Sequence, residues 1–441
     1  MTTKAWWREP TRAQWMSFLA AWLGWVLDAF DFTIYLLVMK DIAAETHVGI
    51  TAVSGSITLT LLVRLAGGAC SGWMADRWGR KLPLMLSLLW FAAFDSAIYF
   101  AATFQAILIL RTLFGFGMGA EWAAGTAMAM ESWPANSRKV ASGLLQAGWP
   151  VGFLLAALVA YFVVPALGWR AMFLIAAVPA LLVVPIRMLV PEQPSWPNQP
   201  RTVRASALRE LAAPGVLRMI VLGSLVMALG FIVYYGLTSQ YALMLATELH
   251  LGGQSAFLHV IAFNIGMLVG VILAGIVANR WGVIVALVAP ALLMVPAIPL
   301  FVGAVPGLLG VGAFLGGLLG VGYSGVTPVL TTGLFPEHVR ARAIGIVYHV
   351  GALVAAFVPT LIAWLATTGG LKLSSAIALV CAVGLVAMSL AVLVLRREIV
   401  PPELAAPGER PRYTPVPSPA RGSAPALTGA APRERGVELR G

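Results

Sequence analysis

Long apolar stretches, separated by short polar or basic segments, recur along most of this sequence. Each stretch has about 18 residues or more, which lets a helix cross a hydrocarbon layer of about 30 Å. We predict twelve such helices, at residues 15–39, 51–74, 82–103, 106–130, 141–165, 169–190, 217–244, 255–278, 283–303, 306–333, 341–367 and 372–395. The pattern therefore predicts an all-α membrane protein with twelve transmembrane helices.

The predicted helices fall into two sets of six, with a polar, arginine-bearing linker at residues 191–216 between them. This linker divides the chain into an N-terminal bundle at residues 15–190 and a C-terminal bundle at residues 217–397. Residues 1–14 form a short segment before the first helix. Residues 398–441 are rich in Pro, Ala, Gly and Arg, a composition that predicts a disordered tail.

The composition changes this picture little. Hydrophobic residues make up 60% of the chain and charged residues 11%, whereas soluble domains carry about 25% charged residues. The first apolar stretch is too long for a cleaved signal peptide and lacks a small-residue cleavage site. We expect the whole series of helices to lie in a bilayer.

The net charge is +11, and the distribution of the basic residues over the connections between helices indicates the topology. Basic residues gather on alternate connections, at Lys4, Arg8, Arg12, Arg77, Arg80, Lys81, Arg138, Lys139, Arg201, Arg204, Arg280, Arg340, Arg342, Arg396 and Arg397. The opposite connections contain only Lys40, Arg170 and Lys372. Because basic loops stay on the cytoplasmic side, we predict an inner-membrane protein with both termini and residues 191–216 in the cytoplasm. This distribution argues against a nucleic-acid partner.

The two halves of the sequence repeat each other. The stretch Gly72-Trp73-Met74-Ala75-Asp76-Arg77-Trp78-Gly79 aligns with Gly275-Ile276-Val277-Ala278-Asn279-Arg280-Trp281-Gly282. Pro134, Arg138 and Gly143 likewise correspond to Pro336, Arg340 and Gly345 at nearly the same offset. The matches predict two six-helix pseudo-repeat bundles that rock around a central site.

Two of these motifs carry a resemblance to a known family. Gly72-x-x-x-Asp76-Arg77-x-Gly79-Arg80-Lys81 resembles the signature loop of the major facilitator superfamily, and Arg111-x-x-x-Gly115-x-Gly117-x-Gly119 resembles its helix 4 motif. Val190-Pro191-Glu192-Gln193-Pro194 is similar to the motif that ends helix 6. The resemblance covers about residues 15–397. It implies the major facilitator fold, in which helices 1, 4, 7 and 10 line a central cavity.

A narrower resemblance points to the sialate and lactate proton symporters. It rests on Gly24-Trp25-Val26-Leu27-Asp28-Ala29-Phe30-Asp31-Phe32, on Gly117-Met118-Gly119-Ala120-Glu121-Trp122 and on Met130-Glu131-Ser132-Trp133-Pro134. One stretch departs from this pattern, because Gly148-Trp149-Pro150-Val151-Gly152 is similar to a helix 5 motif of drug antiporters. Export therefore stays open as an alternative to import.

The signature loop is a candidate gate. We predict that Asp76 forms charge-assisted hydrogen bonds with nearby arginines, and that these bonds break when the bundles rock apart. The gating residues we expect are Asp76, Arg77, Gly79, Arg80, Arg138 and Arg340. The alternative is that these residues only anchor the topology.

Ionisable residues inside the apolar stretches are costly and mark ion or substrate pathways. For proton coupling we predict Asp28, Asp31, Arg111 and Glu121. Asp28 or Asp31 would carry the proton. Its carboxylate would pair with Arg111 when ionised and leave Arg111 when protonated. A permanent ion pair that locks helix 1 to helix 4 is the alternative.

Other polar and aromatic residues inside the helices are candidate substrate ligands. We predict Arg64, Arg111, Gln146, Tyr234, Tyr235, Asn264, Tyr323, Tyr348 and His349. A buried guanidinium such as that of Arg64 suits a carboxylate substrate, although Arg64 could instead neutralise Glu121 or Asp95. His349 could bind an anion or be satisfied by a neighbouring helix.

Together these features predict a proton-coupled symporter that imports a small organic acid. The family resemblance suggests a monocarboxylate such as lactate or pyruvate, or sialic acid. The alternatives are an exporter, an aromatic-acid or sugar carrier, and a membrane sensor. No catalytic residues, metal site or cofactor are expected, the proton being the coupling ion, and we expect a monomer.

Overall fold

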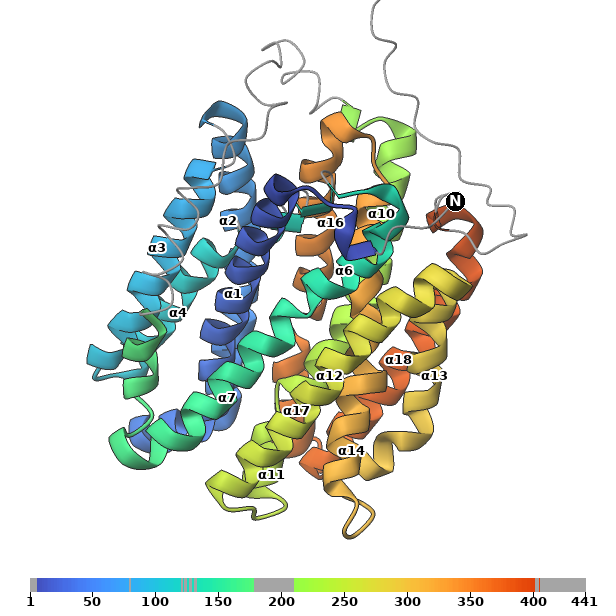
Figure 1. Ribbon diagram of the computed structural model, residues 1–441. Helices are drawn as coiled ribbons and strands as arrows, with labels where there is room; N and C mark the ends of the chain where they lie inside the picture. Colours follow the sequence, from blue (N-terminus) through green and yellow to red (C-terminus); the bar gives the residue numbers. More distant parts are fainter. Residues whose placement is uncertain are drawn as a thin grey trace, which may run out of the picture.

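The computed structural model describes residues 6–78, 81–119, 122, 125–126, 129–130, 133–177, 210–400 and 404. Every regular element in these ranges is helical, and the first-half helices lie beside those of the second half (Figure 1). Within these described ranges, ten spans are long and apolar enough to cross a membrane. The fourth predicted helix is described in part, and the sixth, the linker and the tail fall mostly outside the described residues. The predicted all-α class is confirmed.

The first half is described as six α-helical segments. The bounds are α1 (Arg12–Thr46), α2 (Ile50–Trp78), α3 (Lys81–Ala97), α4 (Phe104–Met118), α6 (Arg138–Gln146) and α7 (Gly148–Leu167). Helix α1 packs on α7, and α4 packs on both α2 and α3. The predicted fifth helix is divided into α6 and α7 because Pro150 has no N–H to continue the helix.

In the second half, several predicted single helices are also divided. The bounds are α10 (Pro214–Thr238), α11 (Tyr241–Thr247), α12 (Gly253–Trp281), α13 (Val283–Phe301), α14 (Leu309–Leu315), η4 (Gly316–Val321), η5 (Gly322–Val326), α15 (Thr327–Gly333), α16 (Glu337–Ala355), α17 (Val358–Thr367) and α18 (Leu373–Ile399). Pro328 and Pro359 lie in the first turns of α15 and α17, where a missing N–H is tolerated. The segment η4 is a π-helix, an element frequent near functional sites.

The two halves meet along α12, which packs on α6 and α7, and along α2, which packs on α16 and α17. Two glycines allow the α6–α12 crossing. A Cβ added at Gly143 would lie 2.6 Å from the carbonyl oxygen of Val271, and one at Gly275 would lie 2.8 Å from that of Lys139. Small residues at such crossings let membrane helices approach closely.

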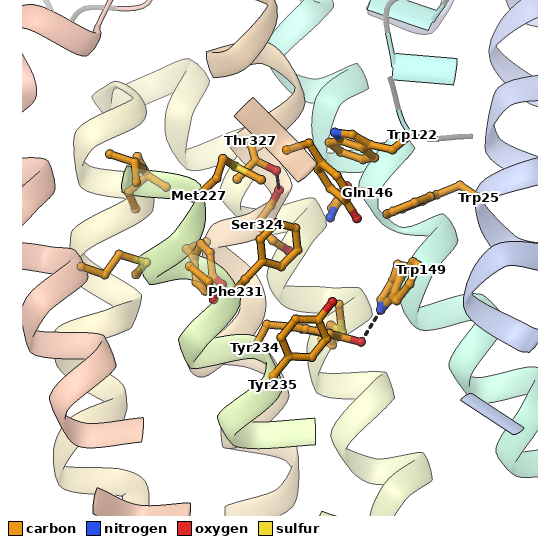
Figure 2. Close-up of a pocket in the computed structure, with 17 residues that line it drawn as sticks. Trp25, Trp122, Gln146, Trp149, Met227, Phe231, Tyr234, Tyr235, Ser324 and Thr327 are labelled. Carbon is orange, nitrogen blue, oxygen red and sulfur yellow. Dashed lines mark hydrogen bonds between the residues drawn. The ribbon is translucent and has the colours of Figure 1, made fainter. Parts of the chain in front are cut away.

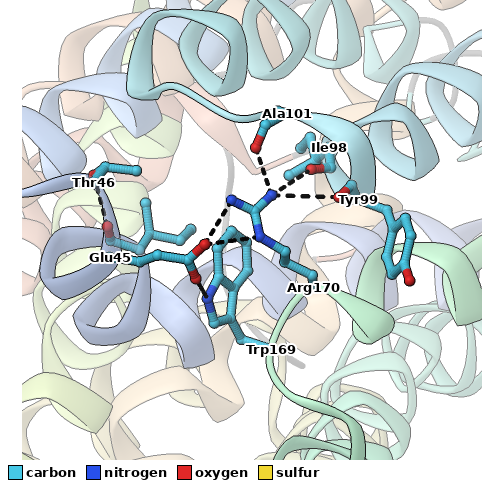
Figure 3. A network of polar contacts seen from close by, with 8 residues as sticks. Glu45, Thr46, Ile98, Tyr99, Ala101, Trp169 and Arg170 are labelled. Atoms are coloured by element: carbon cyan, nitrogen blue, oxygen red, sulfur yellow. Dashed lines mark hydrogen bonds and ion pairs between the residues drawn. The ribbon is translucent and has the colours of Figure 1, made fainter.

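The internal repeat is visible in the polar contacts at one end of the bundles. Glu45, near the end of α1, accepts hydrogen bonds from the indole of Trp169 at 2.6 Å and from Arg170 at 2.8 Å (Figure 3). Glu248, which follows α11 at the same offset that separates Gly72 from Gly275, accepts hydrogen bonds from the backbone and hydroxyl of Ser374. Each half thus fastens the end of its first helix to the start of its last.

Two histidines extend this repeat. His47 and His250, each two residues after its glutamate, have φ of 54° and 52°. Left-handed backbone of this kind is uncommon outside glycine and ends the helix sharply. At the opposite end, Arg138 donates to the carbonyl of Trp133 and Arg340 to that of Phe335, both at 3.0 Å. The repeat predicted from sequence is therefore present in local geometry.

Arg170 is the centre of the contacts in Figure 3, because its guanidinium also donates to the carbonyls that follow α3, including that of Ala101 at 2.5 Å. We expect Arg170→Lys to lower the free energy of unfolding by about 1–2 kcal/mol, because an ammonium cannot reproduce this fork of donors. The matched control is Arg218→Lys. Arg218 is 62% exposed and pairs with Glu398 at 2.7 Å, and such a pair contributes little. Thermal unfolding in detergent measures the stability of both variants. Equal stabilities would contradict the stabilising role assigned to the Arg170 contacts.

Candidate functional site

A cavity lies between the two halves. Its walls come from both, and Figure 2 shows Trp25, Trp122 and Trp149 across the cavity from Phe231 and Tyr235. Apolar side chains, including methionines of α10, α12 and α18, complete the lining. The cavity therefore lies where rocking bundles expose a central site alternately to the two sides.

Aromatic rings in mutual contact form a large part of the cavity wall. The ring of Trp25 lies 4.5 Å from that of Trp149 and 4.7 Å from that of Trp122, measured between centroids. Trp122 stacks on Tyr348 at 4.8 Å and 30°, and Tyr348 meets Phe231 edge-on at 4.9 Å. Because these rings interlock, they form a rigid apolar surface that spans both halves.

Some polar groups of the wall are already paired. The indole of Trp149 donates to the hydroxyl of Tyr234 at 2.5 Å, and the hydroxyl of Tyr323 donates to the carbonyl of Gly230 at 2.5 Å. These bonds join α7 to α10 and η5 to α10. They hold the tyrosine hydroxyls in place and leave them less free to bind a ligand.

Other polar groups of the wall have no partner among the described residues. They are the indole N–H groups of Trp25 and Trp122, the amide oxygen of Gln146 and the hydroxyl of Ser324. An unsatisfied buried polar group costs about 1–3 kcal/mol. A ligand with acceptor oxygens would satisfy the two indole donors.

Among the described residues of the first half, two buried ion pairs are present. Arg64 of α2 contacts Asp28 of α1 at 3.2 Å, and Arg111 of α4 contacts Asp95 of α3 at 2.7 Å. All four side chains are at most 1% exposed. In this structure the predicted coupling partner Arg111 is paired with Asp95 and not with Asp28 or Asp31, because α3 packs on α4 and brings Asp95 to the guanidinium.

Asp31 lies fully buried beside these pairs. Neither of its carboxylate oxygens has a hydrogen-bond partner among the residues that the structure describes. It nevertheless lies within electrostatic reach of Asp28, Asp95 and Arg111. A buried charge with no partner is costly, so this position favours a carboxyl group that binds and releases a proton.

Arg64 also reaches the second half of the protein. Its guanidinium carbon lies 5.1 Å from the ring centre of Tyr348, a cation–π contact between α2 and α16. Tyr348 itself lines the cavity. The Asp28–Arg64 pair is therefore one residue away from the cavity, and the linking contact crosses between the halves.

Hydrogen bonds join the two halves on both sides of the cavity. Toward the end with Glu45, the amide of Gln240 donates to the hydroxyl of Ser54 at 2.9 Å and to the carbonyl of Pro359 at 3.1 Å. Toward the opposite end, the hydroxyl of Ser142 donates to the carbonyl of Gly325 at 2.8 Å. The structure therefore describes a state in which hydrogen bonds join the two halves on both sides of the cavity, which we call the closed state.

The predicted substrate residues divide into two groups. Gln146, Tyr234, Tyr235, Tyr323 and Tyr348 line the cavity, whereas Arg64, Arg111, Asn264 and His349 do not. The amide of Asn264 donates to its own helix at Val260, and His349 is hydrogen-bonded to Gly345 and packs against Gly68 of α2. Arg111 packs over Tyr35 and Phe114.

Sequence reasoning missed the three tryptophans of the wall. Trp25 and Trp122 lie in motifs used for the family resemblance, Trp149 lies in the stretch that departs from it, and each places an indole N–H inside an apolar helix. That donor, which needs a partner, was the available signal.

Among the predicted gating and coupling residues, Gly79, Arg80 and Glu121 lie outside the described residues, and Asp76 and Arg77 are described only through the backbone of α2.

Comparison with known proteins agrees with this architecture. The family model described as Major Facilitator Superfamily matches residues 21–258 and again residues 223–433. The cis,cis-muconate transport protein of Acinetobacter baylyi is 29% identical over 368 residues, which cover 81% of this chain and 89% of that protein. The sialic acid transporter NanX of Escherichia coli is 28% identical over 382 residues, which cover 84% and 92%.

Among solved structures, the proton:xylose symporter XylE bound to 6-bromo-6-deoxy-D-glucose superposes with a TM-score of 0.74. The match has 18% sequence identity and covers 88% of this chain and 96% of that chain. At this identity the likeness establishes the fold.

Proposed function

Because this chain belongs to the major facilitator superfamily, we propose that it is a proton-coupled symporter that imports a small organic acid by alternating access. It is a multi-pass membrane transporter and not an enzyme, since its relatives and fold neighbours are transporters. Two relatives are named as transporters of muconate and of sialic acid, both organic acids. The sequence motifs add lactate and pyruvate as candidate substrates. We place the protein in the inner membrane as a monomer, with cytoplasmic termini.

The observation that carries this proposal is the buried carboxyl group of Asp31, which has no hydrogen-bond partner among the described residues and lies next to the Asp28–Arg64 and Arg111–Asp95 pairs. In our proposal Asp31 carries the proton. A protonated carboxyl group tolerates this position, and a route to water in an open state would let the proton leave.

Coupling to the substrate follows from the contact between Arg64 and Tyr348. Both ion pairs lie within the first half, so rocking of the halves leaves them intact. The Arg64–Tyr348 contact crosses between the halves and would break when the cavity opens. Opening would then change the position of Arg64, and with it the field at Asp28 and Asp31.

The test is uptake by the purified full chain in proteoliposomes. Labelled lactate, pyruvate, sialic acid and benzoate are supplied with an imposed pH gradient, acid outside. We expect at least one acid to accumulate by about tenfold per pH unit, the value for one proton per monovalent anion. Protein-free liposomes are the control, because neutral weak acids also cross lipid. Binding of an acid without any flux would indicate a sensor, and gradient-driven efflux would indicate an exporter.

A further inference from the structure

We infer that the substrate is a planar, conjugated carboxylic acid, whose flat part lies against the aromatic wall and whose carboxylate accepts the indole N–H groups of Trp25 and Trp122. This inference rests on the proposed function, because it specifies the acid that the cavity takes. Its basis is the shape, polarity and charge of the described cavity wall.

The shape of the wall favours a flat ligand. The rings of Trp122 and Tyr348 stack at 30°, and the rings of Trp25 and Trp149 lie 40° apart. Such rings have few rotatable bonds and are held by their neighbours, so they offer preformed flat faces. Conjugated groups stack on such faces, whereas puckered or bulky saturated groups contact them less completely.

The polarity of the wall limits how many polar groups the ligand can carry. Among the described residues of the wall, the buried polar atoms without a partner are two donors, from Trp25 and Trp122, and two further groups, from Gln146 and Ser324. Indole N–H is a donor only, so it calls for an acceptor such as a carboxylate oxygen. A polyhydroxylated acid such as sialic acid would bury several hydroxyl groups without partners, and lactate would leave most of the aromatic surface uncovered.

The charges support the same class of ligand. Arg64 and Arg111 are each engaged by a carboxylate and neither lines the cavity. The acid would therefore be held by neutral N–H dipoles, with the Arg64 guanidinium in contact with the ring of the lining residue Tyr348. Such a site suits a single delocalised charge.

The first test compares ligands on the wild-type chain. Equilibrium binding to the detergent-purified protein is measured for benzoate, nicotinate and cis,cis-muconate. Cyclohexanecarboxylate tests planarity, because it has the size and carboxylate of benzoate but not its flat ring, and benzamide tests the carboxylate. We expect the best conjugated acid to bind about tenfold tighter than cyclohexanecarboxylate. Equal or tighter binding of cyclohexanecarboxylate, lactate or sialic acid would overturn the inference.

The second test removes the two donors. Trp25→Phe and Trp122→Phe keep an aromatic ring and lose the N–H, so each is expected to weaken binding of the conjugated acid by about tenfold. The control is Trp364→Phe on α17, whose side chain is 49% exposed on the outer face. Unfolding temperatures establish that the variants are folded. Unchanged affinity in both cavity variants would refute the assigned donors.

The two proposals can fail separately. If lactate or sialic acid is transported and no conjugated acid binds, the inference falls while the proposed function stands. If no acid is bound or transported by the folded protein, both fall.

Discussion

Replacing Asp31 by asparagine is expected to abolish pH-driven accumulation of the substrate while leaving exchange of substrate across the membrane. The amide has nearly the shape of a protonated carboxyl group, so the closed state would be kept. It cannot release a proton, so the accumulation ratio would fall from about tenfold per pH unit to about one. Exchange needs the cavity to open alternately with substrate bound, and this step requires no deprotonation.

The measurement uses proteoliposomes in two modes, gradient-driven uptake and exchange of labelled for unlabelled acid. Asp41→Asn is the matched control, since Asp41 lies on the same helix at its far end and is only half-buried. It should accumulate substrate like the wild type. Retention of gradient-driven accumulation by Asp31→Asn would assign the proton to another group.

Much of the fold could be predicted from the spacing of apolar residues. Twenty apolar positions in a row admit few structures in a bilayer, because every backbone polar group must be paired within the segment. The repeat was also predictable, since Gly72 and Gly275 occupy equivalent places. The same offset relates Glu45 to Glu248 and His47 to His250, a signal present in the sequence that only the shared geometry makes evident.

The partners of the buried charges could not be predicted in the same way. Depth along a helix can be counted from the sequence, and it placed Asp31 and Arg111 at comparable levels. The rotation of each helix about its axis cannot be counted, and it is this rotation that turns Arg111 toward Asp95. The same limit applies to Asn264 and His349, which lie in cavity-forming helices or next to them but point elsewhere.

The cavity wall illustrates a different limit. Tyrosines of α10 and α16 were predicted because their hydroxyl groups can bind a ligand. Tryptophans in membrane helices more often pack or anchor at the interface, so nothing in the residue type alone distinguished Trp25 or Trp149. What distinguishes them is that residues from both halves converge on one space, which is a property of the assembled bundles.

Breaking the Arg111–Asp95 pair is expected to have the largest effect on stability. Arg111→Leu leaves the Asp95 carboxylate buried without its cation, at a cost of about 3–5 kcal/mol. It also removes the packing of the guanidinium over Tyr35 and Phe114, at 4.6 and 4.1 Å from the ring centres. The double variant Arg111→Leu/Asp95→Leu removes both charges together and should recover most of the loss, because apolar residues can replace a buried ion pair.

This double variant also separates a structural pair from a switching pair. Asp95 and Arg111 lie in α3 and α4 of the same half, so rocking of the two halves does not pull them apart. We therefore expect the double variant to keep gradient-driven uptake, at a reduced rate, while Arg111→Leu alone loses it through instability. Thermal unfolding and uptake are measured on the same preparations. A double variant that is as stable as the wild type yet cannot accumulate substrate would show that the pair itself takes part in the proton cycle. Arg111 would then leave Asp95 and bind Asp31 in a state other than the closed one.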